Sequence, residues 1–432
     1  MVVKKYDLVD YSLLILMYLQ LVILEFFGLS QTLNKVVVVL ILFRILFMRG
    51  SQWRTGLLCF GGLCFLYLCG LLFGSEMNSS YALSNFLMQF YPMVYTYYLV
   101  FLCRNRPEVI DTCLYKGFWI FNLTMIANIY VLLMQIFVPY SITAVVDETH
   151  YISYYEDNIS GLFQYASTHV VCLFTIFIVL YDISYRKKLK KGIQVFGKIL
   201  VVIMIVVAFF IAANSDNKAF YLMLPLALFA YWYAGNMQSV KRLGWILIGI
   251  LLIPLIIYGL YISSSTIKNF IDTNLLHTLD IIINARGLGS SANGSNERVA
   301  IISDGLSMVS TWLVGKGFGS TSIYGSGFLG YNHFGQADFG SIMVLGGIWY
   351  LLLLFYYYLK SFSIIIGVGL FRNNRALKWS VAIIVVSVSI YTQCFTRTNV
   401  ISSLILIMLA FRVRHVDEMS PNTYEEFEVD YN

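Results

Sequence analysis

The sequence predicts an all-α polytopic membrane protein, and three observations support this prediction. About twelve long apolar runs fill the 432-residue chain. Only 12% of the residues are charged and the mean hydropathy is +0.74, whereas soluble domains carry roughly twice that charged fraction. The basic residues between the runs fall almost entirely into every second gap. Because backbone polar groups find no partner in lipid, each run is expected to form a helix.

The runs set the predicted architecture, since a helix needs about 20 apolar residues to cross the hydrocarbon core. They lie near residues 8–27, 32–49, 55–74, 81–103, 114–138, 160–182, 197–213, 219–235, 243–263, 338–360, 378–394 and 398–413. Lys4 and Lys5 precede the first run and no small-residue cleavage site follows it, so we expect a retained helix instead of a removable signal peptide. We find no soluble domain and no internal repeat, which predicts one membrane domain, residues 1–432.

The basic residues also predict an orientation. With the gaps assigned alternately to two sides, one side holds 22 of the 29 Lys and Arg. Cytoplasmic loops carry the excess of Lys and Arg, so we place both termini in the cytoplasm, including an acidic tail, 415–432. The other side keeps seven cations: Lys35, Lys218, Lys268, Arg286, Arg298, Lys316 and Arg397. An anionic ligand would explain such residues; contact with water or lipid headgroups is the alternative, which we favour for Lys35 and Lys268.

The longest gap, 264–337, is a predicted external loop. Val299, Ile302, Leu306, Val309 and Leu313 recur in it at steps of three and four, the pattern of an amphipathic helix lying on a membrane surface. Arg298 stands near the start of this helix, where free backbone N–H groups and a guanidinium together suit a phosphate. An arginine that reaches lipid headgroups is the other interpretation.

Two further features of this loop are candidates for chemistry. The glycine-rich segment 315–320 lacks the spacing of a P-loop; its backbone N–H groups are candidates for binding an anion, and a flexible connector is the alternative. His333 stands just before the run that begins near Asp338, where a histidine can act as a base near neutral pH. The alternative for His333 is an ordinary interfacial residue.

Polar side chains also occur inside the apolar runs. They are His169, with Gln164 and Thr168 beside it, and Asn122, Asn128 and Gln135. Ionisable groups within a membrane are functional candidates, whereas hydrogen bonding between helices is the more common use of the amides.

Taken together, these features resemble the O-antigen polymerase and ligase superfamily of bacterial envelopes. The likeness in architecture covers nearly the whole chain. The likeness in motifs covers about 296–350: Glu297-Arg298, then Gly315-Lys316-Gly317-Phe318-Gly319, then Asn332-His333 before a run that contains Gly346-Gly347. The resemblance implies a GT-C-like glycosyltransferase that needs neither metal nor cofactor and uses undecaprenyl-diphosphate-linked glycan on the outer face of the bacterial cytoplasmic (inner) membrane.

The resemblance also implies roles for single residues. Arg298 resembles the arginine that opens the loop helix, and His333 resembles the loop histidine near the acceptor. Lys218 stands on an outward turn where relatives often have an arginine, and a lysine does not offer bidentate phosphate recognition.

The expected function is therefore polymerisation of lipid-linked repeat units into a surface polysaccharide, an O-antigen of lipopolysaccharide or a capsule. Arg298, Lys218, Arg286, Lys316 and Arg397 are the candidates for binding the diphosphate. His333 is the candidate base, with Asp338 or Glu297 as further choices. An O-antigen ligase and a polysaccharide flippase are the alternatives; a transporter should show repeated halves and broken helices, and the sequence reveals neither. Besides the lipid-linked glycan and membrane lipid, a chain-length regulator is a possible partner, and we expect no nucleic acid.

Overall fold

The computed structural model describes, with short gaps, residues 5–138, 159–233, 315–320 and 338–416, together with isolated positions between 258 and 313. Within these residues the protein is helical and has no strand. The main elements are α1 (Lys5–Leu19) with a π-helical turn η1 (Gln20–Leu24), α2 (Ser30–Phe47), α3 (Arg54–Phe73), α4 (Ser79–Asn105), α5 (Pro107–Lys116), α6 (Phe118–Phe137), a 3₁₀ helix η3 (Gly161–Ala166), α8 (Thr168–Tyr185), α9 (Lys191–Asn214), α10 (Phe220–Tyr233), α15 (Asp338–Ile366), α17 (Arg375–Tyr391) and α18 (Thr398–Val416).

Helices lie at eleven of the twelve predicted apolar runs, and the remaining run, 243–263, falls mostly outside the described residues. Four described helices are long and apolar enough to cross a membrane, namely α3, α4, α6 and α15. Five further apolar helical stretches are shorter than 18 residues: Leu8–Val22, His169–Tyr185, Gly197–Ala212, Leu377–Ser389 and Thr398–Val413. The all-helical class and its membrane-protein character agree with the prediction, whereas the total of twelve spans stays a prediction.

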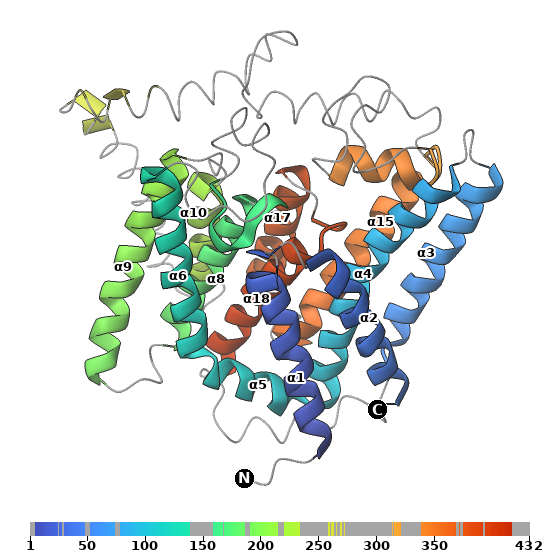
Figure 1. Cartoon of the computed structure of the whole chain (residues 1–432), viewed down its shortest axis with the longest axis horizontal. Helices are drawn as coiled ribbons and strands as arrows, with labels where there is room; N and C mark the ends of the chain where they lie inside the picture. The colour runs from blue at the N-terminus through green and yellow to red at the C-terminus, as the bar shows by residue number, and fades with distance from the viewer. Residues whose placement is uncertain are drawn as a thin grey trace.

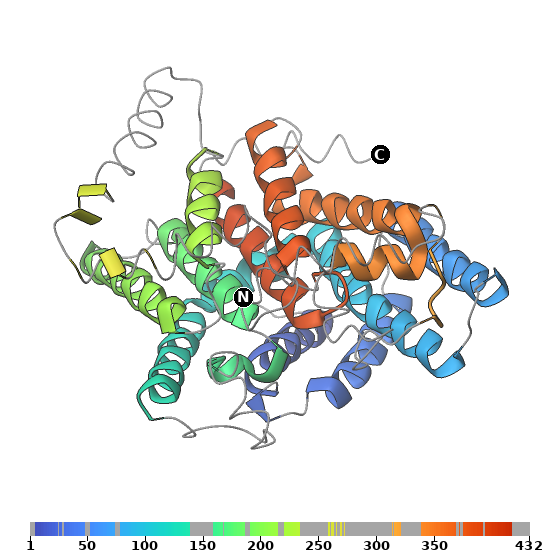
Figure 2. The same cartoon turned by 90° about the horizontal axis from the view of Figure 1, so that it is seen from above.

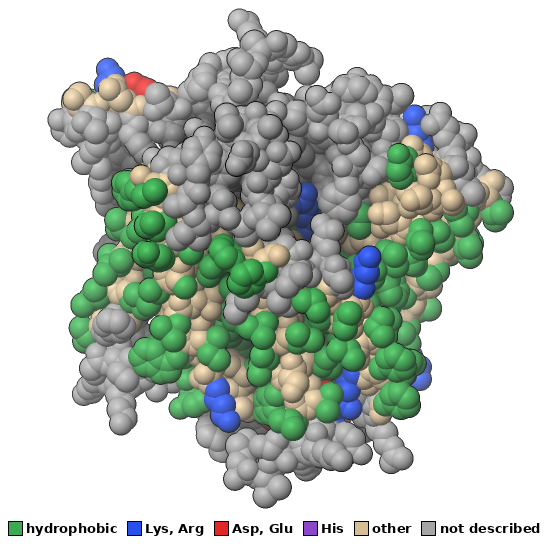
Figure 3. Space-filling view, viewed as in Figure 1, with side chains coloured by type: hydrophobic (Ala, Val, Ile, Leu, Met, Phe, Trp, Pro, Cys, Tyr) green, Lys and Arg blue, Asp and Glu red, His purple; other side chains and the backbone are tan. Residues whose placement is uncertain are grey.

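The helices form a bundle with α18 at its centre (Figures 1 and 2). Helix α18 packs against α8, α4 and α15, and its residues from Val400 to Phe411 are almost all buried. In Figure 1, α6, α8, α9 and α10 stand on one side of α18 and α3, α4 and α15 on the other. Figure 3 shows hydrophobic side chains over much of the described surface, with Lys and Arg side chains near its lower edge and others higher up.

Helices α3 and α4 are neighbours with opposite environments. In α4, 78% of the spanning segment is buried, against 22% in α3. Helix α4 begins where the Asn78 side chain accepts hydrogen bonds from the backbone N–H groups of Ser80 and Tyr81, a usual N-cap. Helix α3 exposes Leu58, Leu68 and Leu72, which would face lipid.

Helix α5 is a separate short helix at one end of the bundle, although the sequence predicts one run over 114–138. It ends at Gly117, and α6 begins at Phe118. A Cβ at Gly117 would lie 2.6 Å from the Phe121 ring and 2.8 Å from the Cys113 carbonyl oxygen, so a larger residue would fit there only if these neighbours shifted. We call this end of the bundle the α5 end, and the opposite end, where α4 begins, the Asn78 end.

Helix α15 is broken, a feature that the predicted apolar run over 338–360 does not reveal. Gly347 has φ 68° and ψ −166° inside the helix, a backbone conformation open mainly to glycine. The break separates a short segment, Asp338–Gly346, from residues 348–366. These 19 residues rise about 28 Å at 1.5 Å per residue, so the second segment alone has the length of a span and the break lies near one end of it.

The two chain ends of the described bundle lie on the same side. Arg44 at the end of α2 and Arg106 just before α5 both bind Asp10 of α1, and Arg412 near the end of α18 binds Asp111 of α5. The beginning of α1 and the end of α18 therefore share the α5 end (Figure 1), as the alternating assignment of the gaps requires.

Candidate functional site

The α5 end contains a fully buried carboxylate whose oxygens are both satisfied. Asp10 is 0% exposed. Arg44 donates to it from Nε and NH2, each at 2.8 Å, and Arg106 donates from NH1 at 3.0 Å. The Tyr98 hydroxyl donates at 2.8 Å. Bidentate arginine and several hydrogen bonds are what a buried carboxylate requires, so these four residues, the Asp10 network, join α1, α2 and α4.

A second ion pair at the same end joins α5 to α18. Arg412 donates to Asp111 from Nε at 2.9 Å, and its NH1 lies 3.4 Å from the Ile365 carbonyl oxygen at the end of α15. The arginines at the α5 end thus hold helices together. The sequence does not reveal the role of Asp10, because this residue stands inside an apolar run, 34 and 96 residues away from its arginines.

At the Asn78 end, the segment 315–320 docks onto the break in α15. The backbone N–H of Lys316 donates to the Val344 carbonyl at 2.7 Å, and that of Gly317 to the Leu345 carbonyl at 3.1 Å. An intact helix would use residues 348 and 349 to satisfy these two carbonyls, so the segment supplies the hydrogen bonds that the break removes.

The same segment also contacts α3 and α4. Gly317 lies against Gly70, where a Cβ would approach to 3.1 Å from the Gly317 Cα. The Asn85 side chain donates to the Phe318 carbonyl at 2.8 Å, and the Asn78 N–H donates to the Gly319 carbonyl at 3.1 Å. The Phe318 side chain is buried.

These contacts correct both predictions for the glycine-rich segment. It is docked over its length and not a flexible connector. The N–H groups of Lys316, Gly317 and Ser320 donate to protein carbonyls, so they do not form a nest of free donors for an anion. The side chain of Lys316 is half-buried.

The first residue of α15, Asp338, is also fully buried. Its Oδ2 accepts from the backbone N–H of Phe395 at 2.7 Å, and the N–H of Cys394 also interacts with this carboxylate. Its Oδ1 is buried and without a hydrogen-bond partner. The half-buried Arg397 follows the turn at 394–396 and acts electrostatically on Asp338.

Three of the predicted site residues are therefore brought to one short element. Arg397 acts electrostatically on the first residue of the Asp338–Gly346 segment, and the backbone N–H of Lys316 is bound to its seventh. These two positions of the segment, Asp338 and Val344, are about 9 Å apart along the helix axis at 1.5 Å per residue. The other candidates, Arg298, His333, Lys218, Arg286 and Glu297, lie outside the described residues, as does the predicted amphipathic helix up to residue 312.

The amide side chains within the apolar runs form hydrogen bonds with other parts of the chain, which is the use that the sequence favours. Asn122 of α6 donates to Asp182 of α8 at 3.0 Å. Gln135 accepts from the N–H of Gly161 at 2.9 Å, and Asn128 accepts from that of Leu162 at 2.8 Å, which fixes η3 against α6. His169 is half-buried in α8.

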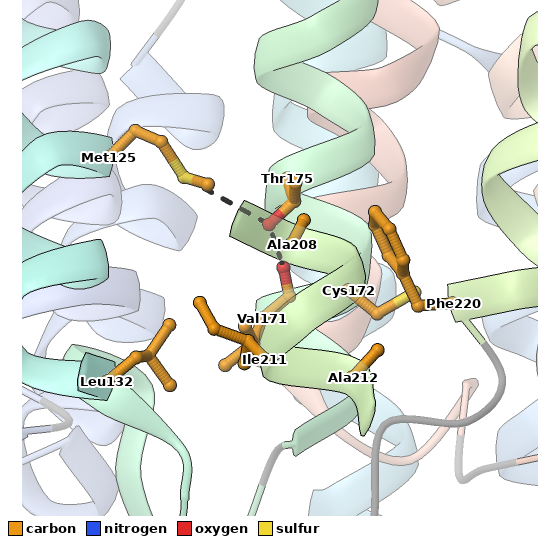
Figure 4. Close-up of a pocket in the computed structure, with 9 residues that line it drawn as sticks. All are labelled: Met125, Leu132, Val171, Cys172, Thr175, Ala208, Ile211, Ala212 and Phe220. Carbon is orange, nitrogen blue, oxygen red and sulfur yellow. Dashed lines mark hydrogen bonds between the residues drawn. The ribbon is translucent and has the colours of Figure 1, made fainter. Parts of the chain in front are cut away.

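One pocket lies between α6, α8, α9 and α10, and it is too small and too apolar for a sugar. Its volume is about 10 Å³, roughly the room that one water needs. Figure 4 shows its lining: Met125, Leu132, Val171, Cys172, Thr175, Ala208, Ile211, Ala212 and Phe220. The Thr175 hydroxyl donates to the Val171 carbonyl of its own helix at 2.7 Å. We therefore place the candidate site at the Asn78 end and not in this pocket.

Comparison with known proteins adds no family assignment: the chain matches no family model, and no curated protein is significantly similar to it in sequence. Among the residues that the structure describes, no three His, Cys, Asp or Glu side chains gather as metal ligands. The site must therefore be interpreted from its own geometry.

Proposed function

We propose that this chain is a polysaccharide polymerase that joins undecaprenyl-diphosphate-linked repeat units on the outer face of a bacterial cytoplasmic membrane. The observation that supports this proposal is that Lys316 and Arg397 both lie against one short segment of α15, Asp338–Gly346, away from the Asp10 network. If the α5 end is cytoplasmic, as its basic residues favour, then both cations face outward, where lipid-linked glycans are polymerised.

The chemistry needs a cationic site and a base. A hydroxyl of the acceptor sugar attacks the anomeric carbon of the donor glycan, the bond from that carbon to the diphosphate oxygen breaks, and the hydroxyl proton passes to a base. Negative charge grows on the departing undecaprenyl diphosphate, which fixed cations stabilise. We assign this stabilisation to Lys316 and Arg397 with Arg298, Lys218 and Arg286, and the proton transfer to His333.

The broken helix α15 is the observation that favours the transporter alternative, because discontinuous helices mark the binding sites of many transporters. Two features count against that interpretation. The break lies near one end of a segment long enough to span, and the Val344 and Leu345 carbonyls accept hydrogen bonds from the docked segment. Each of these carbonyls is thus already bound within the protein.

The test uses purified protein in liposomes together with lipid-linked repeat units extracted from cells that lack this chain. A polymerase lengthens the glycan on the lipid; a ligase transfers it only when an acceptor such as lipid A core is added; a flippase moves it across the bilayer and makes no new bond. Unchanged repeat units with the wild-type protein would contradict the proposal.

Two variants sharpen this test. Arg397→Gln should reduce glycan lengthening by about 10²-fold, the order expected for one donor to a developing charge. Lys35→Gln is the matched control, since Lys35 is an exposed lysine near the beginning of α2, and it should keep wild-type activity.

A further inference from the structure

The turn at Cys394, Phe395 and Thr396 is fixed to α15 in two ways. Its backbone is bound by Asp338, through the Phe395 N–H at 2.7 Å. Its one aromatic ring, Phe395, stacks on Tyr358 at 4.9 Å with an angle of 12° between the rings, and meets Phe355 edge-on at 5.1 Å. Phe395 and Tyr358 are buried and Phe355 is half-buried, so the turn has little freedom to move relative to α15.

The fixed turn also restricts the position of the Arg397 backbone. It follows the turn directly, and its carbonyl accepts the N–H of Ile401 at 3.1 Å in the first turn of α18. The residue is therefore held between the bound turn and a buried helix. A guanidinium that must meet a diphosphate benefits from a fixed backbone, because errors of about 1 Å in placement cost large factors in rate.

We propose that Asp338 is a positioning residue: its carboxylate shapes the 394–396 turn and thereby places Arg397 for the diphosphate of the lipid-linked substrate, and it does not take a proton in the reaction. This inference rests on the proposed function. It assigns Asp338 a different role from the catalytic base that the sequence suggests, and leaves that role to His333.

The burial of Asp338 distinguishes a positioning residue from a catalytic base. A base must come within hydrogen-bond distance of the acceptor hydroxyl, and Asp338 is 0% exposed, enclosed by the 394–396 turn and the first segment of α15. One of its oxygens is used by the backbone of the turn. Position 338 requires only a hydrogen-bond acceptor, and the oxygen of a neutral amide side chain is such an acceptor.

The decisive variant is therefore Asp338→Asn. The amide oxygen can still accept from Phe395 but cannot act as a base near neutral pH, so we expect glycan lengthening within about threefold of wild type. Removal of a general base would instead cost about 10²- to 10⁴-fold. A large loss in Asp338→Asn, with an unchanged melting temperature, would overturn the inference.

Asp338→Ala tests the link to Arg397. We expect it to resemble Arg397→Gln in activity, and the double variant to lose little more than Arg397→Gln alone, because two residues acting through one position are not additive. Additive losses would show that Asp338 acts independently of Arg397. If Asp338→Ala does not fold, the comparison of Asp338→Asn with wild type still decides between a positioning residue and a base.

A binding measurement separates this inference from the proposed function. Farnesyl diphosphate serves as the probe, and its affinity is measured for full-length protein in detergent. We expect about a tenfold weaker affinity in Arg397→Gln and Asp338→Ala and wild-type affinity in Asp338→Asn and Lys35→Gln. If that order appears while wild type lengthens no glycan, positioning stands and the polymerase proposal fails. Wild-type affinity in Asp338→Ala would overturn the positioning role.

Discussion

Two buried carboxylates in different parts of the bundle are stabilised in different ways. At the α5 end, Asp10 is neutralised by the side chains of Arg44 and Arg106. Beside the second segment of α15, Asp338 is bound by the backbone of a turn, with Arg397 just beyond it. The carboxylate of Asp10 is bound by arginine side chains, whereas that of Asp338 is bound by backbone N–H groups. The comparison teaches that a buried carboxylate can be stabilised by side chains or by backbone, and that the sequence alone does not show which of the two applies.

The largest expected effect comes from breaking the Asp10 network. Asp10→Ala leaves Arg44 and Arg106 without their carboxylate, and removal of one partner from a buried ion pair costs about 3–5 kcal/mol. The melting temperature of the protein in detergent should therefore fall strongly, and less protein should reach the membrane. A melting temperature equal to wild type would mean that the α5 end is not held by this network.

The labelling rate of the Cys113 thiol in α5 measures how well the α5 end is shielded from water. Burial raises the pKa of the Cys113 thiol to about 11, with Lys116 opposing the shift. Only the thiolate reacts with maleimide, so at pH 7.5 labelling should be about a hundredfold slower than for a thiol of pKa 9, at tenfold per pKa unit. The rate should rise with pH until about pH 11. Fast labelling at pH 7.5 in the folded protein would show that α5 is open to water.

At the Asn78 end the corresponding test adds a methyl group at a close backbone contact and leaves the charges unchanged. Gly70→Ala brings a Cβ to 3.1 Å from Gly317 and 3.2 Å from the Phe318 nitrogen, and such overpacking costs about 1–3 kcal/mol. We expect a lower melting temperature and reduced glycan lengthening.

Gly61→Ala is the matched control for Gly70→Ala in the same helix. A Cβ at Gly61 meets nothing within 4 Å, and alanine is the better helix former by about 1 kcal/mol. This variant should be as stable as wild type or slightly more so. Equal behaviour of the two alanine variants would argue that the 315–320 segment does not dock on α3.

The smallest expected effect is that of Asp111→Asn. Asp111 also pairs with an arginine at the α5 end, but its side chain is 39% exposed where that of Asp10 is 0%. Exposed ion pairs contribute about 0–1 kcal/mol, so the unfolding free energy should change by no more than that. A loss as large as that of Asp10→Ala would mean that burial does not explain the difference between the two pairs.

The sequence predicts the helices well, because apolar length and lipid leave a backbone few other choices. It also predicts the separation of charges, since Arg44, Arg106 and Arg412 lie at one end and Lys316 and Arg397 at the other. It does not reveal Asp10 and Asp182, which stand inside apolar runs and depend on partners from distant helices.

The candidate site is predicted only in part for a related reason. The break at Gly347 and the docking of 315–320 depend on backbone N–H and carbonyl groups. Because every residue carries these groups, the identity of the residues does not predict either feature. Asp338 suggests a base by its chemistry alone, and only the turn that it binds argues for another role. Arg298 and His333, which the proposed mechanism needs, remain predictions.

Helix α18 carries one consequence beyond the site itself. Arg397 precedes its first turn and Arg412 lies near its other end, so 15 residues, or about 22 Å of rigid helix, separate two arginines on opposite faces of the bundle. Because one continuous helix connects the two arginines, a displacement of the Asp111–Arg412 pair should also displace the backbone at Arg397. Asp111→Asn therefore offers a way to ask whether contacts at the α5 end affect the 394–396 turn.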